Sequence, residues 1–503
     1  MMMTAKGCKT YIDIAFKPAI LSQEPAGEPS RNLVIFTTRC AVDKMKMFGT
    51  NGIRGIANEY LDNELSVKVG MAIAHVLGPG PVAMATDSRI SSPMIFSAVS
   101  AGLMSMGVSV IDLGLVPTPA LQYFVKTHGD VTAGVMITAS HNPPEFNGIK
   151  CISGDGTECT HEEESAIEAA FEKDLTTVPW DRIGGMTRVA DAGERYIDSI
   201  VSKVDVDAIR DADLRIVLDC ANGASVHTSP LLLERLGVSA VVINGEPDGM
   251  FPGHYSEPVK ENLTELMETV KELHADLGIA HDGDADRCVF VSDTGEYLPG
   301  DIGLALLSIP AMRNARGKKQ LVTTVATSNT VGDVVSAEGG ETVRTAVGSP
   351  IVARRMMETG APIGGEDNGG IIFADHQFCR DGAMAAARMM EFAARYGSVQ
   401  AQVDKLPRYH TVKLVVPCPD DMKQRAVDEM AKRHASERLD TTDGLRISYD
   451  DGWVLLRPSG TEPKFRIHSE SRDPGLAEGR AEAFSKELGA LCSKPRPARG
   501  SKA

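Results

Sequence analysis

Residues 138–150 read Thr-Ala-Ser-His-Asn-Pro-Pro-Glu-Phe-Asn-Gly-Ile-Lys, and this stretch decides how the chain is interpreted. It follows an apolar run at 134–137 that is typical of the end of a buried strand. Two consecutive prolines cannot continue a central strand or a helix interior, so Ser140 is predicted to lie on a loop at a strand end. In α/β sheets, such loops carry the chemistry. Taken alone, Ser140 with His141 is more often a polar turn with a capping serine.

A second loop, Asp282-Gly283-Asp284-Ala285-Asp286-Arg287, follows another strand-like run at 277–280. Carboxylates at alternate positions can converge on one point and supply the hard oxygen ligands that Mg²⁺ prefers. A solvated acidic turn is the simple alternative. A calcium loop of the EF-hand type is excluded, because that loop needs glycine in place of Arg287 and glutamate in place of Asp293. The sequence therefore predicts a metal site in this loop.

Two further loops add ligand-binding chemistry. The run Gly364-Gly365-Glu366-Asp367-Asn368-Gly369-Gly370 is flexible and acidic, so it suits the neutral or cationic part of a ligand better than a phosphate. The run Arg457-Pro458-Ser459-Gly460-Thr461-Glu462-Pro463 combines a guanidinium, two hydroxyls and a turning backbone. That combination favours an anion site for a phosphate dianion. For each loop, a plain turn is the alternative.

Between these loops the chain alternates between short apolar strands and helices. Strands are predicted at 82–85, 108–113, 214–218, 238–243 and 414–417, and helices at 93–106, 228–236 and 420–436. Such alternation implies mixed α/β layers. A chain of 503 residues suggests about three to four domains.

Together, and in this order, the four loops resemble those of the α-D-phosphohexomutase family, which comprises phosphoglucomutases, phosphomannomutases and phosphoglucosamine mutases. The resemblance covers residues 47–490 and includes the segments 48–55, 86–89 and 248–263. It implies an α/β fold with three similar mixed α/β domains and a smaller C-terminal α+β domain around a central cleft. The expected domains are 47–205 with the phosphoserine loop, 206–300 with the metal loop, 301–403 with the sugar-specificity loop and 404–492 with the phosphate-binding loop.

The resemblance also implies a reaction. Ser140 is expected to be phosphorylated in the active enzyme and to pass its phosphoryl group to the sugar. The resulting 1,6-bisphosphate of glucosamine or glucose is the expected intermediate and primer. One Mg²⁺ per subunit is expected on Ser140, Asp282, Asp284 and Asp286. Because the bisphosphate must turn over in the site, we expect hinge motion of the last domain.

Further site residues follow from the same resemblance. The expected catalytic group is completed by His141, Lys150, Arg287 and Arg54. Lys150 and Arg287 are the expected acid/base pair, while His141 would hold the phosphoserine loop. The sugar is expected on Glu366, Asp367 and Asn368, and its distant phosphate on Arg457, Ser459, Gly460 and Thr461. Arg380 and Asp381 either brace the sugar site or form a structural salt bridge.

The substrate is the least constrained expectation. The glycine-rich loop looks most like that of archaeal phosphoglucosamine mutases, and Gly370 stands where several bacterial members carry histidine. Glu366 and Asp367 could pair with a 2-ammonium group, or accept hydrogen bonds from the 3- and 4-hydroxyls that glucose and mannose share. We expect interconversion of glucosamine 6-phosphate and glucosamine 1-phosphate. A mutase of mannose and glucose phosphates is the alternative, and a phosphosugar phosphatase or an inactive phosphosugar-binding regulator is more remote.

Composition limits the partners and the compartment. The net charge of −16 argues against nucleic acid, whose backbone needs basic patches. No apolar run reaches the length of a membrane span, so no membrane contact is expected. Nine widely spaced cysteines indicate neither a zinc site nor a disulfide framework, and Cys151 and Cys288 are interpreted as small buried fillers. A small phosphosugar and a cytoplasmic location are expected, and the oligomeric state stays open.

The two ends of the chain stand apart from the rest. Residues 1–46 are expected to be a disordered or spurious N-terminal extension, since they lack the apolar core of a signal peptide and precede the family-like sequence. Deletion of this extension should leave activity unchanged. Residues 493–503 are expected to form a disordered tail.

Overall fold

The computed structural model describes residues 47–49, 52–460 and 462–493. The expectations for residues 1–46 and for the tail after Ser493 therefore lie outside the described residues. Ser493 itself follows the last helix and donates its hydroxyl to the carbonyl oxygen of Gly489 at 2.6 Å.

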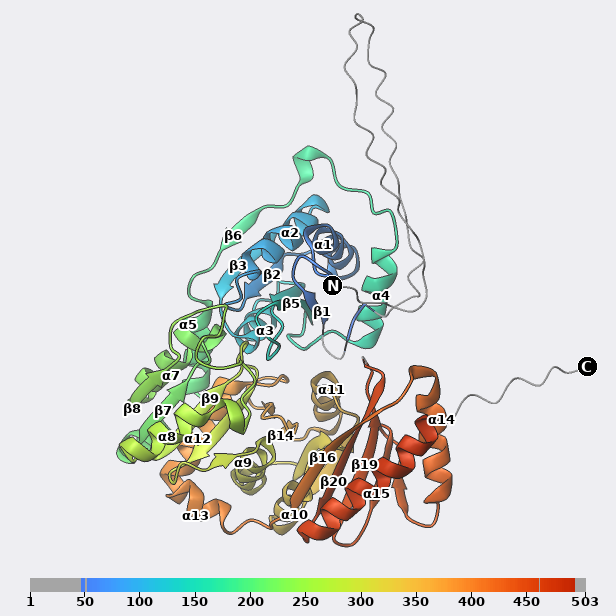
Figure 1. The fold of residues 1–503 in the computed structure, drawn as a ribbon. Coiled ribbons are helices and arrows are strands. Elements are labelled where there is room, and N and C mark those ends of the chain that lie inside the picture. The colour runs from blue at the N-terminus through green and yellow to red at the C-terminus, as the bar shows by residue number, and fades with distance from the viewer. Residues whose placement is uncertain (1–46, 50–51, 461, 494–503) are drawn as a thin grey trace, which may run out of the picture. The chain divides into compact units, whose positions relative to one another are not determined.

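The first domain is a mixed sheet with helices on both faces (Figure 1). Its elements are β1 (Ile53–Ile56), α1 (Asn63–Leu77), β2 (Val82–Thr86), α2 (Ser92–Ser105), β3 (Val110–Leu115), α3 (Thr118–Thr127), β4 (Ala133–Ile137), β5 (Phe146–Ser153), α4 (His161–Phe171), the 3₁₀ turn η1 (Trp180–Arg182) and β6 (Met186–Arg188). The strand order is β1-β5-β4-β2-β3-β6. Alternate residues of β2 face opposite sides: Val82 and Met84 pack in the core of α1, α2 and α4, whereas Ala83 and Ala85 pack in the core of α3.

The second domain repeats the layered plan, and its first helix lies before the border expected at 205–206. Its elements are α5 (Ala192–Val201), α6 (Val206–Asp211), β7 (Arg215–Asp219), the 3₁₀ turn η2 (Ala224–His227), α7 (Ser229–Leu236), β8 (Ser239–Ile243), the 3₁₀ turn η3 (Lys260–Asn262), α8 (Thr264–Leu273), β9 (Leu277–His281), β10 (Cys288–Ser292) and β11 (Tyr297–Leu298). The strand order is β11-β10-β9-β7-β8, with β9 parallel to β7 and antiparallel to β10. The loop between β9 and β10 is the predicted metal loop.

The third domain has a smaller mixed sheet. Its elements are α9 (Gly300–Asn314), β12 (Gln320–Thr324), α10 (Asn329–Ala337), β13 (Glu341–Thr345), α11 (Ser349–Thr359), β14 (Ile363–Gly365), β15 (Ile371–Phe373), α12 (Gly382–Tyr396) and α13 (Val399–Val403). The strand order is β13-β12-β14-β15. Strands β14 and β15 are antiparallel, and the glycine-rich loop joins them.

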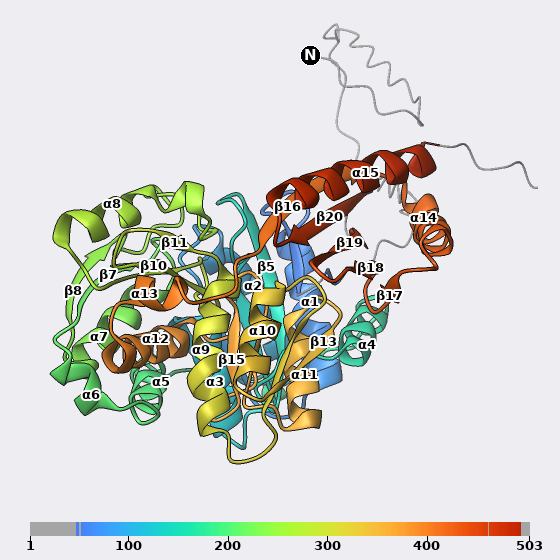
Figure 2. The ribbon, with the colours of Figure 1, turned by 90° about the horizontal axis from the view of Figure 1, so that it is seen from below.

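The fourth domain has the predicted α+β character. Its elements are β16 (His410–Pro417), α14 (Asp420–Arg433), β17 (Arg438–Asp440), β18 (Leu445–Ser448), β19 (Gly452–Pro458), β20 (Lys464–Ser471) and α15 (Pro474–Cys492). The sheet order β16-β20-β19-β18-β17 is antiparallel throughout. Figure 2 shows α14 and α15 on the same face of this sheet. Asp473 begins α15 by accepting a hydrogen bond from the amide of Leu476, and Pro474 fits its first turn.

The apolar core is divided unequally among the domains. One continuous cluster runs from α3 through β7 and β9 to α9 and α12, so the first three domains share it. The fourth domain has its own core between its sheet and α14 and α15. A small cluster of Val325, Ala326, Trp453 and Leu455, with Val347 packed against it, joins the third domain to the fourth. The fourth domain is therefore the most separately packed part of the described chain.

The predicted strands and helices are confirmed, with shifted ends. The strand expected at 414–417 begins earlier, at His410. Because β16 lies at a sheet edge, its first four residues are mostly exposed and mostly polar, so the apolar pattern did not include them. The helix expected at 420–436 ends at Arg433. None of the helices in the described segments combines the length and apolar character needed to cross a bilayer.

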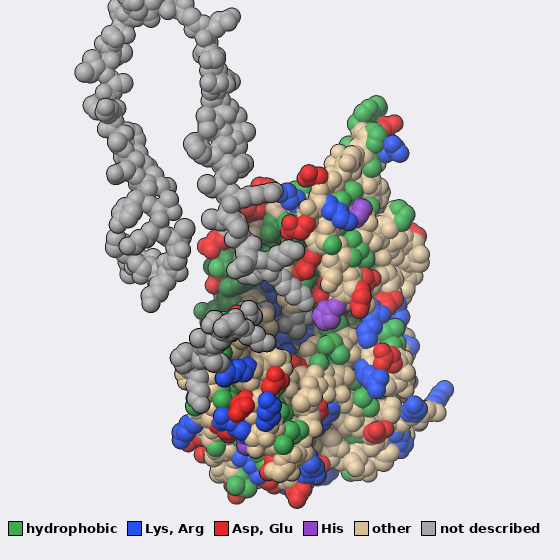
Figure 3. Space-filling view, turned by 90° about the vertical axis from the view of Figure 1, so that its right-hand side faces the viewer, with side chains coloured by type: hydrophobic (Ala, Val, Ile, Leu, Met, Phe, Trp, Pro, Cys, Tyr) green, Lys and Arg blue, Asp and Glu red, His purple; other side chains and the backbone are tan. Residues whose placement is uncertain are grey.

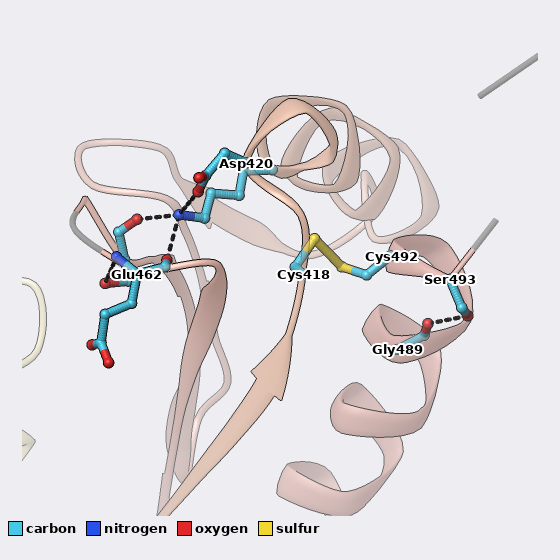
Figure 4. The surroundings of a disulfide bond; sticks show 8 residues. Cys418, Asp420, Glu462, Gly489, Cys492 and Ser493 are labelled. Atoms are coloured by element: carbon cyan, nitrogen blue, oxygen red, sulfur yellow. Dashed lines mark hydrogen bonds and ion pairs between the residues drawn. A yellow bond between two sulfur atoms is a disulfide. The ribbon is translucent and has the colours of Figure 1, made fainter. Parts of the chain in front are cut away.

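The prediction from cysteine spacing was wrong in one respect. Cys418, after β16, and Cys492, at the end of α15, form a disulfide (Figure 4). The two positions are 74 residues apart, so sequence spacing does not reveal that α15 packs back along β16. Cys151 and Cys288 are buried free thiols, as predicted.

Candidate active site

Each of the four predicted loops lies at the carboxyl end of a strand. Ser140 follows β4, the metal loop follows β9, Glu366 follows β14, and Arg457 lies at the end of β19. Figure 3 shows a hollowed face of the molecule, with Lys and Arg side chains inside the hollow. Basic side chains there favour an anionic ligand.

Ser140 meets the metal loop directly. Its hydroxyl donates to Asp282 Oδ2 at 2.8 Å and lies 3.4 Å from His141 Nδ1. The residue is only 1% exposed, and its backbone is left-handed, with φ of +55°. A non-glycine residue in this region is strained, and such strain persists where surrounding contacts fix it. Here the amide of Ser140 donates to Thr138 Oγ1 at 2.9 Å.

Arg89 organises the Ser140 loop, a role that the sequence did not reveal. Its guanidinium donates to the carbonyl oxygens of Ser140, Asn142, Pro143 and Phe146 at 2.6–2.8 Å. Asp87 pairs with Arg89 Nε at 3.0 Å. Burial raises the pKa of Asp87, although Arg89 and neighbouring hydroxyls oppose that shift. The Asp-Ser-Arg sequence directly after β2 was the available signal.

The metal loop packs against the Ser140 loop without room for a side chain. A Cβ added at Gly283 would lie 2.5 Å from the carbonyl oxygen of Ser140. Ser256 Oγ donates to the same oxygen at 3.3 Å. The close approach of the two loops therefore requires glycine at position 283.

The three aspartates form a compact buried group. Oxygens of Asp282, Asp284 and Asp286 lie within 4.8 Å of one another. Burial, with the charges of Asp286 and Asp284, raises the pKa of Asp282 to about 7. Asp284 Oδ1 and Asp286 Oδ1 are buried and have no hydrogen-bond partner among the described residues. Converging, unpartnered carboxylate oxygens fit a divalent cation.

Lys150 contacts the same carboxylates from the first domain. Its Nζ lies 2.6 Å from Asp284 Oδ2 and 3.3 Å from Asp286 Oδ2. Burial alone would lower the pKa of Lys150, but the two carboxylates outweigh it and raise the pKa above its ordinary value. Burial likewise acts to raise the pKa of Asp284, but Lys150 holds that pKa below its usual range. Thr118 Oγ1 also donates to Asp284 at 2.6 Å, a contact that no sequence motif indicated.

Three further predicted residues surround Ser140. Arg287 Nε lies 3.7 Å from Asp282 Oδ2 and 3.9 Å from Asp286 Oδ1. Arg54 Nη1 donates to the side-chain oxygen of Asn142 at 2.9 Å. Burial, with the charges of Arg287 and Arg54, lowers the pKa of His141 to about 2. His141 is therefore a neutral imidazole at physiological pH.

Arg380 links the metal loop to the glycine-rich loop. Its Nη2 donates to Asp286 Oδ2 at 2.6 Å, and its Nη1 lies 3.5 Å from Glu366 Oε2. The expected alternative of an Arg380–Asp381 salt bridge was wrong. Asp381 instead accepts a hydrogen bond from Gln377 Nε2 at 2.8 Å. It also caps the start of α12 by accepting a hydrogen bond from the amide of Met384.

The sugar-specificity loop is held from several sides. Glu366 Oε1 accepts from the amide of Gly348 at 3.1 Å, and burial raises the pKa of Glu366. Asp367 Oδ2 lies 3.2 Å from Lys413 Nζ of the fourth domain. Asn368 Oδ1 accepts from the amide of Gly370 at 3.1 Å, which closes the turn.

The phosphate-binding loop is braced from α14. Lys423 Nζ donates to the carbonyl oxygens of Ser459 and Glu462 at 2.5 and 2.6 Å (Figure 4). Arg457 Nε donates to Asp443 Oδ2 at 2.7 Å. A Cβ added at Gly460 would meet no atom of the described residues within 4 Å. Thr461 lies outside the described residues.

Comparison with known proteins finds family matches over most of the described chain. The phosphoglucomutase/phosphomannomutase α/β/α domains I, II and III match residues 45–177, 194–295 and 299–409, and the C-terminal domain matches 414–487. The chain belongs to the phosphoglucomutase/phosphomannomutase family. It is thus a phosphohexomutase, as its motifs indicated, with the predicted four-domain α/β fold.

The relatives of this phosphohexomutase carry two kinds of name. A phosphoglucomutase/phosphomannomutase of Thermococcus kodakarensis is 43% identical, covering 85% of this chain and 95% of the relative. A probable phosphoglucosamine mutase of Methanopyrus kandleri is 42% identical, covering 87% and 97%. A crystal structure of a family member from Burkholderia thailandensis superimposes with a TM-score of 0.80 at 27% identity, covering 90% and 98%.

Proposed function

We propose that this phosphohexomutase interconverts glucosamine 6-phosphate and glucosamine 1-phosphate through a phosphoserine at Ser140 and a 1,6-bisphosphate. The observation that carries the proposal is the position of the Ser140 hydroxyl, 2.8 Å from Asp282 within the carboxylate group. A hydroxyl on a strained loop beside a cation site is suited to receive and release a phosphoryl group.

Charge balance explains why a cation is needed. A phosphoserine carries about −1.5 to −2 charge at neutral pH and would face three carboxylates. Mg²⁺, held by Ser140, Asp282, Asp284 and Asp286, would neutralise this charge and withdraw electron density from the phosphoryl oxygens. Lys150 already places one ammonium group on this carboxylate cluster.

The neighbouring cations supply the remaining catalytic roles in this proposal. Lys150 is held as an ammonium by its carboxylate partners, so it is in the acid form. Arg287 Nε is buried without a hydrogen-bond partner among the described residues, which leaves it available to a reacting phosphoryl group or sugar hydroxyl. We assign these two residues as the acid/base pair. His141 would position the loop, with Arg54 beside it.

The far end of the substrate is assigned to the third and fourth domains. Glu366, Asp367 and Asn368 would contact the sugar, and Arg457, Ser459, Gly460 and Thr461 its second phosphate. Hinge motion of the fourth domain, which has a separate core, would let the bisphosphate reverse its ends. A phosphatase would need no second phosphate holder, so the braced Arg457 loop disfavours that activity.

The choice of sugar rests on the relatives and on Asp367. Archaeal relatives named as probable phosphoglucosamine mutases support glucosamine. The partly exposed Asp367 carboxylate could pair with a 2-ammonium group. The Thermococcus kodakarensis relative named phosphoglucomutase/phosphomannomutase supports the alternative of mannose and glucose phosphates.

A coupled assay with the 1- and 6-phosphates of glucosamine, glucose and mannose separates these sugars. Each sugar is tested with and without glucose 1,6-bisphosphate as primer. A preference for glucosamine of about 100-fold in kcat/KM, which is about 2.7 kcal/mol, supports the proposal. Equal rates on glucose and mannose, with none on glucosamine, would establish the alternative.

The nucleophile is tested separately from the sugar. Ser140→Ala should abolish the phosphoprotein mass after incubation with the bisphosphate and nearly all turnover. Ser97→Ala, which changes an exposed serine on α2, is the matched control and should keep both. Wild-type turnover in Ser140→Ala would eliminate the phosphoserine route.

A further inference from the structure

Asp443 joins the phosphate-binding loop to the third domain. It lies in the turn between β17 and β18, and its Oδ2 accepts two hydrogen bonds. One comes from Arg457 Nε at 2.7 Å, and the other from the amide of Val347 at 3.0 Å. Val347 belongs to the loop between β13 and α11 of the third domain. A single carboxylate oxygen therefore connects two domains at the residue proposed to bind phosphate.

The turn that carries Asp443 is fixed in place. Gly444 has φ of +82°, and an added Cβ would lie 2.3 Å from the carbonyl oxygen of Leu456 on β19. The turn therefore lies directly against the end of the strand that carries Arg457. The amide of Thr442 also donates to Asp440 Oδ1 at 2.8 Å, which closes the turn from the other side. Asp443 is a short side chain on a rigid support.

The loop on the third domain is equally tied to the sugar-specificity loop. Val347 donates its amide to Asp443, and the next amide, that of Gly348, donates to Glu366 Oε1 at 3.1 Å. The Val347 side chain packs against the cluster that contains Trp453 of the fourth domain. Glu366 lies 3.5 Å from Arg380, and Arg380 contacts Asp286. Polar contacts, joined by the backbone step from Val347 to Gly348, therefore connect Arg457 with the carboxylate group.

The geometry of the Arg457 contact suits a positioning role. The Arg457 guanidinium has three nitrogens that donate hydrogen bonds, and the Asp443 contact uses Nε. The terminal pair, Nη1 and Nη2, forms the fork that binds two phosphate oxygens at once. A carboxylate on Nε fixes the plane of the guanidinium without occupying that fork. Fixing a long, flexible side chain before binding reduces the entropy lost when the ligand arrives.

We propose that Asp443 is a positioning residue that orients Arg457 for the substrate phosphate, and that its second hydrogen bond, from the Val347 amide, ties this orientation to the third domain. This inference rests on the proposed role of the Arg457 loop as phosphate holder. Because the ion pair is partly exposed, its contribution to stability is small, and the effect of removing it should be on substrate binding.

Steady-state kinetics with glucosamine 6-phosphate test the proposal. Asp443→Ala should raise KM about fivefold, equivalent to about 1 kcal/mol, and change kcat less than about twofold. Asp443→Asn keeps the shape and an acceptor oxygen, so its KM should lie between those of the wild type and Asp443→Ala. Asp450→Asn is the control, because it removes an exposed ion pair with Arg438 in the same domain.

A double-mutant cycle separates positioning from general damage. In an Arg457→Ala background, Asp443→Ala should raise KM no further, because its target is gone. A KM for Asp443→Ala equal to that of Asp450→Asn overturns the inference, as does a full Asp443 effect without Arg457. If the alanine variant misfolds, Asp443→Asn still tests the inference. Thermal unfolding of Asp443→Asn and of the control should show that both variants are folded. An unchanged KM in Arg457→Ala alone would instead refute the phosphate-holding role, and the inference with it.

Discussion

Breaking the Cys418–Cys492 disulfide should destabilise the fourth domain by about 2–4 kcal/mol. The bond joins positions 74 residues apart and so closes nearly the whole fourth domain into a loop. For a loop of this length, the restriction of the unfolded chain alone gives about 4.5 kcal/mol, and measured values are commonly smaller. The double variant Cys418→Ser, Cys492→Ser should therefore unfold at a lower urea concentration than the wild type.

Tryptophan fluorescence provides a local probe of this effect. The chain contains two tryptophans: Trp453 is 1% exposed in the fourth domain, whereas Trp180 is 86% exposed in the first. In a Trp180→Phe background, fluorescence reports the unfolding of the fourth domain. Dithiothreitol should shift the midpoint of the disulfide-containing protein and leave the serine variant unchanged. A difference below about 1 kcal/mol between the two proteins would contradict the expected contribution.

Three other substitutions test separate features of the structure. Gly283→Ala should lower kcat about 100-fold or more, because the new Cβ would displace the Ser140 carbonyl oxygen; a coupled assay showing wild-type turnover would exclude that close contact. Arg89→Gln should lower the free energy of unfolding by about 3–5 kcal/mol, since its carboxylate partner would remain as an unpaired buried charge; urea denaturation showing a loss below about 1 kcal/mol would contradict this. Burial lowers the pKa of His254, but its hydrogen bond to Asp219 outweighs burial and leaves the pKa above 6.5. The stabilisation by His254 should therefore be complete below pH 6.5 and be lost as the pH rises through the raised pKa of His254. The Tm difference between wild type and His254→Asn should then be larger at pH 6 than at pH 9. A larger Tm difference at pH 9 would contradict this pH dependence.

The sequence predicted the parts of the site that follow from local patterns. Ser140 and the three aspartates stand directly after apolar strands, and strand ends are where such residues converge. The layered domains followed from the alternation of strands and helices. Each of these inferences needs only residues that lie close together in the chain.

The remaining features depend on contacts between distant segments. Arg89 was visible as a strand-end residue, but its four carbonyl partners come from the Ser140 loop some fifty positions later. Thr118 and Asp443 do not belong to any recognisable motif, because their contacts arise from the packing of one domain on another. The Cys418–Cys492 pair is similarly defined by the return of α15 along β16.

The shared core of the first three domains has a consequence for protein engineering. Segments of those domains cannot be exchanged between relatives one at a time, because each exchange would create mismatched side chains in the same interior. The fourth domain meets the rest of the described chain through a small apolar cluster and a set of polar contacts, so it is the natural unit for building chimeras. Replacing it with the fourth domain of a relative that prefers a different sugar would show how much of the sugar selectivity this domain determines.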